Sequence, residues 1–230
     1  MKNQPNDYAA KRAYQDSEQA QSYDARRFSS WRGKIGHALD IRALKKVLVY
    51  LSNSPQTTKL LDIPCGTGRI TRFLLEEGYM VTGADMSREM MQVAENKVAQ
   101  FKNFDGFYQE DAAKTSFAND SFDCIVSIRF IGHIPEPVRV QMLQEFARIS
   151  PYAIIEYSIK TPTVTWRRRI DHYLKTGLRL PARWPWHISG RDELTKELNQ
   201  GGLQIVNMWA KLPLFSDSYY VLVQRSQEVI

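Results

Sequence analysis

The chain has 230 residues, of which 43% are hydrophobic, and this is enough for one well-packed α/β domain. No apolar run approaches the roughly 20 residues of a membrane-spanning helix, and the polar start Met1–Pro5 predicts no secretory signal. Two cysteines, Cys65 and Cys124, are too few for a disulfide framework, so we expect a protein of the reducing cytoplasm.

The net charge of +6 is concentrated in one segment. Between Ile159 and Arg191 the sequence has eight basic residues and one acid, a net charge of +7, so the rest of the chain is close to neutral. Three of the five tryptophans lie in the same segment. This asymmetry is the second informative feature of the chain.

The first 52 residues predict helices. A helix over 8–23 is expected in the polar, tyrosine-containing N-terminal segment 1–32. Residues 33–52 carry apolar side chains at helical spacing, and Asn53-Ser54-Pro55 ends that pattern. We interpret 33–52 as a core helix without chemistry of its own.

The stretch Lys59–Thr71 predicts a buried strand, a glycine turn and the start of a helix. Gly66 and Gly68 let the backbone approach a ligand, and the first N–H groups of the helix face that ligand. Thr71 stands where a dinucleotide fingerprint needs Gly or Ala, and the Gly-Lys-Ser/Thr of a phosphate-binding loop is missing. Asp62, directly before the turn, repels phosphates and suits a cation, which favours S-adenosylmethionine (SAM) as the cofactor.

The sequence Asp62-Ile63-Pro64-Cys65-Gly66-Thr67-Gly68 resembles motif I of the class I SAM-dependent methyltransferases, in particular their type 11-like subgroup. Pro64 replaces the usual first Gly, a variant that also occurs in the family. The resemblance covers about 58–157 well and 187–225 more weakly. It implies an α/β, Rossmann-like seven-stranded sheet of order 3-2-1-4-5-7-6, with the last strand antiparallel and helices on both faces. The product would be S-adenosylhomocysteine (SAH).

Further acids follow at suitable distances. The strand 79–85 ends in Asp85, where a carboxylate can accept both ribose hydroxyls, although a simple helix cap is the alternative. After a third strand near 106–112, the resemblance assigns Asp111 to the adenine amine, with Glu110 as its rival. The cofactor-binding residues that the resemblance implies are Asp62, Pro64, Gly66, Thr67, Gly68, Arg69, Asp85, Met86, Asp111, Ala112 and Ser127, together with Tyr23 and Arg27 from 1–32. That N-terminal segment is either a lid over the cofactor or a loosely packed surface arm.

The fourth strand, 122–127, is apolar on both faces, as a central parallel strand should be. In the loop after it, Gly132-His133-Ile134-Pro135 keeps the family's usual His but not the acid before it. His133 is therefore either a general base or a structural histidine. Arg129, at the mouth of the site, can hold a carboxylate or phosphate.

The last third of the chain completes the pattern. A helix starting at Pro137 leads to a strand over 152–157, where Glu156 and Tyr157 reach the ligand edge, and Tyr157 is the second catalytic candidate. A helix opened by Ser189 and closed by Gly201-Gly202 precedes two antiparallel strands, 204–211 and 218–224.

The insert 159–190 lies where this family varies its substrate cover, and three interpretations stay open. It caps an anionic or lipid-like acceptor, with contact to a membrane surface through 159–191; it binds RNA; or it is a solvated lid. The substrate-binding candidates are Arg129, Glu156, Trp166, Arg168 and His187. The histidines have no metal-ligand spacing, so no metal is expected.

The leading hypothesis is a single methyltransferase domain, 1–230, that transfers the methyl group of SAM to an O or N atom of a small-molecule or lipid-like acceptor. An RNA-modifying methyltransferase and a catalytically silent SAM-binding regulatory module are the alternatives, and a nicotinamide dinucleotide is the rival cofactor. The sequence determines neither the acceptor nor the oligomeric state.

Overall fold

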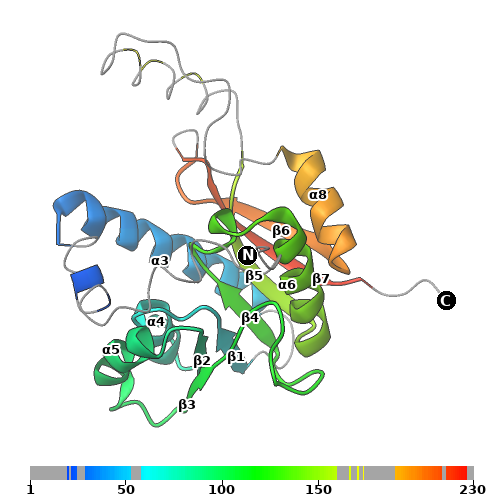
Figure 1. Cartoon of the computed structure of the whole chain (residues 1–230). Coiled ribbons are helices and arrows are strands. Elements are labelled where there is room, and N and C mark those ends of the chain that lie inside the picture. Colours follow the sequence, from blue (N-terminus) through cyan, green and yellow to red (C-terminus); the bar gives the residue numbers. More distant parts are fainter. Residues whose placement is uncertain are drawn as a thin grey trace, which may run out of the picture.

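The computed structural model of the chain describes residues 20, 22–24, 29–52, 58–159, 166, 170, 173, 190–213 and 216–226. Figure 1 shows a central sheet with α3, α4 and α5 on one side and α6 and α8 on the other. The elements in chain order are α3 (Trp31–Leu51), β1 (Lys59–Asp62), α4 (Arg69–Glu76), β2 (Met80–Asp85), α5 (Arg88–Val98), β3 (Phe104–Gln109), β4 (Cys124–Ser127), η1 (Ile131–His133), α6 (Glu136–Ile149), β5 (Tyr152–Ser158), α8 (Arg191–Gln200), β6 (Leu203–Ala210) and β7 (Ser218–Arg225).

The strand order is β3-β2-β1-β4-β5-β7-β6, which confirms the predicted order. The first five strands pair in parallel, whereas β7 runs antiparallel to both of its neighbours, β5 and β6. The central strand β1 pairs with β2 on one side and with β4 on the other. In open α/β sheets such a reversal of strand order places a ligand crevice at the carboxyl ends of those strands.

Two apolar layers hold the helices to the sheet. On one face, Met142 and Phe146 of α6 are completely buried with Leu198 of α8. On the other face, Leu44 of α3 and Leu74 of α4 are equally buried. The inner strands need apolar residues on both faces because helices cover both, which explains their continuous apolar sequences.

The observed bounds differ from the predicted ones by one or two residues at several ends. The third strand begins at Phe104 rather than near 106, because Phe104 pairs with Val81 before the register shifts. The fourth strand begins at Cys124 rather than 122, since the Phe122 N–H donates to the Ile149 carbonyl outside the sheet.

Local caps explain several helix starts. The Ser30 hydroxyl accepts from the Gly33 N–H at 3.1 Å before α3, and Ser87 does the same for the Met90 N–H before α5. The predicted cap at Ser189 lies outside the described residues; α8 is preceded by Gly190. Most of 1–32 and 159–190 also lies outside them, so the lid and the insert stay predictions. Among the described helices, none is both long and apolar enough to cross a membrane.

Candidate functional site

The glycine turn joins β1 to α4 at the carboxyl edge of the sheet. The Ile63–Pro64 peptide bond is cis, and the Cys65 N–H donates to the Ala84 carbonyl of β2 at 2.8 Å. Gly66 and Gly68 have φ of +51° and +73°, conformations that favour glycine. A Cβ on Gly68 would lie 2.7 Å from the Cβ of Ala94, so this glycine also lets α4 and α5 approach each other.

Asp85 connects the turn to the next strand. One carboxylate oxygen accepts from the Gly66 N–H at 2.8 Å, and the other accepts from the Ser87 N–H at 2.8 Å. Burial raises the pKa of Asp85, while these backbone donors act in the opposite direction. The carboxylate is thus fixed beside the turn, and each oxygen keeps acceptor capacity for a ligand hydroxyl.

Asp62, at the end of β1, is buried and accepts from the Thr71 hydroxyl at 2.6 Å. Burial, the largest cause, and the nearby charge of Asp85 together raise its pKa to about 7, against the lowering effect of the Thr71 bond. A buried carboxyl with this pKa is stabilised in its charged form by a cation. The residues at this point therefore fit the α-ammonium group of an amino-acid-like ligand.

Ser127 gives an independent sign that the crevice is built for a polar ligand. It ends β4, beside the turn, because the Ile63 N–H donates to the carbonyl of the preceding Val126 at 3.0 Å. Its hydroxyl oxygen is buried, and none of the described residues hydrogen-bonds to it. A buried polar atom of this kind normally has a partner, which a ligand in the crevice would supply.

Two residues after β3, Glu110 and Asp111, are candidates for the third acid of the site. Both oxygens of Glu110 accept from Ser116, one from its hydroxyl and the other from its N–H. Asp111 accepts from the Ala113 N–H at 3.0 Å, and Ala112 between them is buried. Both acids thus have hydrogen-bond partners within the protein, and Asp111 stays the predicted partner of an adenine amine.

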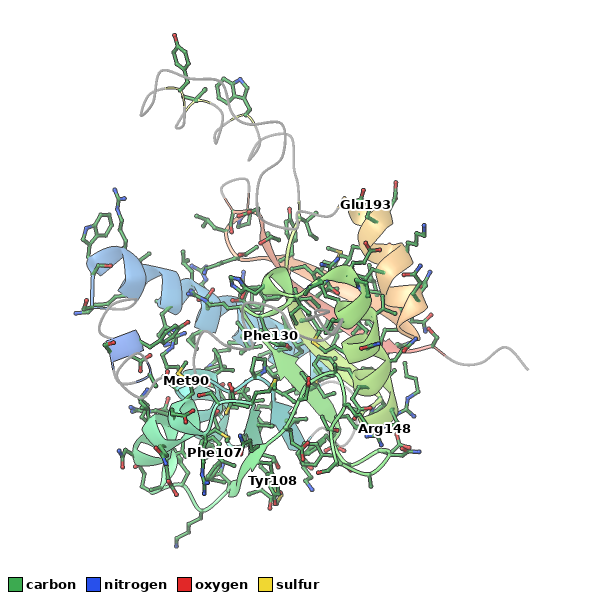
Figure 2. The ribbon with its side chains drawn as sticks, viewed as in Figure 1. Met90, Phe107, Tyr108, Phe130, Arg148 and Glu193 are labelled. Atoms are coloured by element: carbon green, nitrogen blue, oxygen red, sulfur yellow. The ribbon has the colours of Figure 1, made fainter. Side chains whose placement is uncertain are left out.

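Side chains of α5 and β3 lie close to the same crevice. Met86 follows β2 and is half-buried, and its carbonyl accepts from the Gln109 side chain at 3.1 Å. The methyl of Met90 lies 3.8 Å from where a Gly66 Cβ would be. Figure 2 labels Met90, and also Phe107, whose ring leaves no room for a Cβ on Gly83, at 2.4 Å.

The N-terminal segment reaches the turn through a residue that the sequence analysis missed. Asp24 accepts from the Thr67 hydroxyl at 2.8 Å and forms an ion pair with Lys97 of α5. Arg69 lies 4.0 Å from the same carboxylate, and burial lowers the pKa of Arg69 to about 10, with Arg129 adding to the effect. Tyr23, the predicted contact, is half-buried beside Asp24, and Arg27 lies outside the described residues.

A charged network occupies the ends of β4 and β5. Asp40 of α3 is 1% exposed and forms ion pairs with both Arg129 and Lys211, while the Tyr220 hydroxyl donates to it at 2.7 Å. The Arg129 N–H donates to Glu156 at 2.9 Å. Arg129, predicted to hold a substrate anion, thus already shares its charge with Asp40.

The same network raises or lowers the pKa of its neighbours. Burial and the charge of Asp40 raise the pKa of Glu156, against the opposite effect of Lys211 and Arg129. His37 lies one turn before Asp40 on α3, and burial together with Arg69 lowers its pKa. A neutral imidazole beside the cofactor turn is a candidate base that the sequence analysis did not identify, because 33–52 was interpreted as core packing only.

The two predicted catalytic residues lie in different surroundings. Tyr157 is 3% exposed, and its hydroxyl donates to Glu197 of α8 at 3.1 Å, within a buried pair of Glu197 and Arg139. Successive residues of a strand face opposite sides, so Tyr157 faces α6 and α8, away from Glu156. His133 ends η1 and is exposed, and Figure 2 labels Phe130 just before it.

The remaining predicted residues divide into two groups. Trp166 is helical and 68% exposed, whereas Arg168 and His187 lie outside the described residues.

No group of three or more His, Cys, Asp or Glu side chains in the described residues could hold a metal ion. Cys65 and Cys124 are buried free thiols.

Comparison with known proteins now gives this geometry a family context. A model of the family described as "Methyltransferase domain" matches residues 60–150. The ubiquinone biosynthesis O-methyltransferase of Coxiella burnetii is 31% identical over 160 residues, covering 65% of this chain and 64% of that protein. Methyltransferase GfsG of Streptomyces halstedii is 35% identical over 94 residues, covering 40% of this chain and 33% of that protein. The chain thus spans less than two thirds of the length of these curated relatives.

Solved structures match over most of the chain. The magnesium protoporphyrin IX methyltransferase of Synechocystis with bound SAM has a TM-score of 0.67 at 19% identity, covering 96% of this chain and 99% of that one. The same enzyme with bound SAH gives a TM-score of 0.66 at 21% identity, covering 86% of this chain and 88% of that one. At such identity the likeness concerns the fold. The sequence matches identify residues 60–150 as a methyltransferase domain, and the sheet order and the solved structures show that the chain has the fold of these methyltransferases.

Proposed function

We propose that this chain binds SAM at the glycine turn and transfers its methyl group to an O or N atom of a small-molecule or lipid-like, anionic acceptor. When bound, SAM supplies a methyl group activated by the sulfonium, which the acceptor atom takes by direct displacement to leave SAH. The protein's task is to align the acceptor and to exclude water. The observation that carries the proposal is a row of three acids at one edge of the sheet: Asp62 and Asp85 end β1 and β2, and Asp111 follows β3.

Each acid suits one part of the cofactor. Asp62 would hold the ammonium group, because its raised pKa favours a cationic partner. Asp85, fixed by Gly66 and Ser87, would accept the ribose hydroxyls, and Asp111 the adenine amine. The Ser127 hydroxyl would gain the partner that the described residues do not give it.

The acceptor would lie between α3 and the ends of β4 and β5. Hydroxyl and protonated amine acceptors must lose a proton, and the two histidines of this region, His37 and His133, can accept it. Arg129 and Glu156 would form the polar floor of this site, held by Asp40. We leave Tyr157 out of the proposed site, because its hydroxyl is bound to Glu197 on the other face of the sheet.

The basic segment supports an anionic or lipid-like acceptor and contact with a membrane surface. Trp166, Ile170 and Tyr173 are helical and exposed, and their spacing places them on one helix face. An apolar face within a segment of net charge +7 is typical of a helix that lies on an anionic membrane surface. An RNA site would use aromatic stacking, which Trp166 and Tyr173 can provide and Ile170 cannot.

Two experiments test the proposal. The purified chain, wild type and Asp85→Ala, is titrated with SAH and separately with NAD in a calorimeter; saturable SAH binding that Asp85→Ala weakens at least about tenfold is expected. Binding of NAD but not SAH would contradict it. Incubation of a small-molecule extract, a lipid extract and total RNA with methyl-labelled SAM then identifies the acceptor class; transfer to RNA alone would favour the RNA-modifying alternative. No transfer despite SAH binding would favour the silent module.

A further inference from the structure

The strongest unassigned feature is the contact between the N-terminal segment and the cofactor turn. Asp24 accepts from the Thr67 hydroxyl at 2.8 Å and pairs with Lys97, and the Lys97 ammonium donates to the Thr67 carbonyl at 2.7 Å. Each of the three residues thus contacts the other two, and we call this set of contacts the triangle. Thr67 is 3% exposed and lies inside this triangle.

The triangle joins three parts of the chain that are far apart in sequence. Asp24 comes from the N-terminal segment, Thr67 from the turn and Lys97 from α5. Thr67 stands between Gly66 and Gly68, both with positive φ, so its position sets the direction of the N–H groups that face a ligand. Asp24 therefore couples the position of the N-terminal segment to the conformation of the turn.

The segment is packed against the body of the protein at this point. Ala20, one helical turn before Asp24, is 1% exposed. The Asp24 and Lys97 side chains are only 29% and 26% exposed, so solvent screens their attraction less than it screens a surface pair. Arg69, the first residue of α4, adds a second positive charge near the carboxylate.

We propose that Asp24 is a positioning residue for the cofactor: its bonds to Thr67 and Lys97 hold residues 20–24 against the turn and slow the release of the cofactor. This inference rests on the proposed function, since the turn must bind SAM and SAH. It goes beyond that function because it assigns the residence time of the cofactor to Asp24, a residue outside the family motifs. Asp24 acts through Thr67 and Lys97 and takes no part in the chemistry.

The test measures the rate of SAH release by stopped-flow tryptophan fluorescence and the affinity by calorimetry. Asp24→Asn keeps the size and the acceptor for Thr67 but removes the charge; Asp24→Ala removes both contacts. We expect release to be about fivefold faster in Asp24→Asn and faster still in Asp24→Ala, with association rates changed less than about twofold. Lys97→Met should speed release at least as much as Asp24→Asn, since it also removes the bond to the Thr67 carbonyl, and adding Asp24→Asn to it should change release little, because the ion pair is already lost.

Two controls separate positioning from general stability. Glu77→Gln removes the exposed ion pair with Lys45, at 2.9 Å, and should leave SAH release unchanged. Asp24→Glu keeps the charge and should recover most of the slow release. Raising the salt concentration from about 0.05 to 0.5 M should speed release from the wild type but not from Asp24→Asn, an effect that a purely structural role would not produce.

The outcomes distinguish this inference from the proposed function. SAH binding with a release rate that Asp24→Ala leaves within twofold of the wild type overturns the positioning role and leaves the cofactor site intact. Equal loss of unfolding temperature with and without SAH, at an unchanged release rate, also overturns it. Absence of any SAH binding to the wild type overturns the proposed function, and the positioning role with it.

Discussion

Asp62 makes cofactor binding depend on pH in a way that can be calculated. Its pKa in the free protein is about 7, so at pH 6 the carboxyl is protonated in about nine of ten molecules. A cation within hydrogen-bonding reach lowers a carboxyl pKa by about one to three units. Binding of the SAH ammonium at pH 6 should therefore release about 0.4 to 0.9 proton, and the affinity should be about fivefold to tenfold weaker at pH 6 than at pH 8.

The sign follows from the direction of the shift. The pKa of Asp62 is higher in the folded than in the unfolded protein, so the free protein loses stability as the pH rises through the interval from about 4 to 7. A bound cation removes this loss, because it stabilises the charged carboxylate. As the pH rises, the affinity for SAH should thus increase while the free energy of unfolding of the free protein decreases. Both changes should come from Asp62.

The assay is calorimetry of SAH binding at pH 6 in two buffers with different enthalpies of ionisation, since the difference in heat gives the number of protons released. Asp62→Asn is the matched control, because it retains the size of the side chain and an oxygen that can accept from Thr71. The variant should bind SAH more weakly, with proton release close to zero. Equal heats in both buffers for the wild type, or equal proton release in the variant, would refute the role given to Asp62.

Three further predictions concern stability. Gly68→Ala should lower the free energy of unfolding by about 1–3 kcal/mol and weaken SAH binding, because of the positive φ and the contact with Ala94; an unchanged urea midpoint would contradict this. Arg139→Met should cost about 3–5 kcal/mol, since it leaves Glu197 buried without its partner, and adding Glu197→Leu should recover much of the loss in thermal unfolding. Asp40→Asn should cost about 2–3 kcal/mol, as two cations lose their shared anion; a melting temperature within one degree of the wild type would argue against the network.

The sequence predicted the features that are local in the chain. Asp62, the two glycines and Asp85 lie within one strand–turn–helix–strand unit, and their spacing fixes their place at the sheet edge whatever the rest of the chain does. The sheet order followed from the family resemblance that these residues carry. A short motif thus contains enough information for the fold and for the position of the candidate site.

The contacts that could not be predicted join distant parts of the chain. Asp40 meets Arg129, Lys211 and Tyr220, which are between 89 and 180 residues away, and no pattern in the sequence marks such a meeting. Asp24 reaches Thr67 across 43 residues in the same way. Such pairs of side chains meet only when the helices and strands pack together, and the hydrophobic periodicity of the sequence does not show which elements will pack.

The sequence also does not determine which face of the sheet a residue at a strand end occupies. Glu156 and Tyr157 are adjacent, and the sequence predicts that both reach the ligand edge. In the structure the two side chains lie on opposite faces of the sheet. Glu156 faces α3, whereas Tyr157 faces α6 and α8, where its hydroxyl donates a hydrogen bond to Glu197. Which of two neighbours faces the site depends on the helix that covers each face, and only the folded chain determines this.

A calorimetric titration of SAH into the wild-type chain at pH 8 tests cofactor binding at the turn most directly. We predict saturable one-to-one binding that Asp62→Asn and Asp85→Ala both weaken, while Glu77→Gln does not. A titration of the folded wild type without saturable heat, or binding that neither site variant affects, would contradict it.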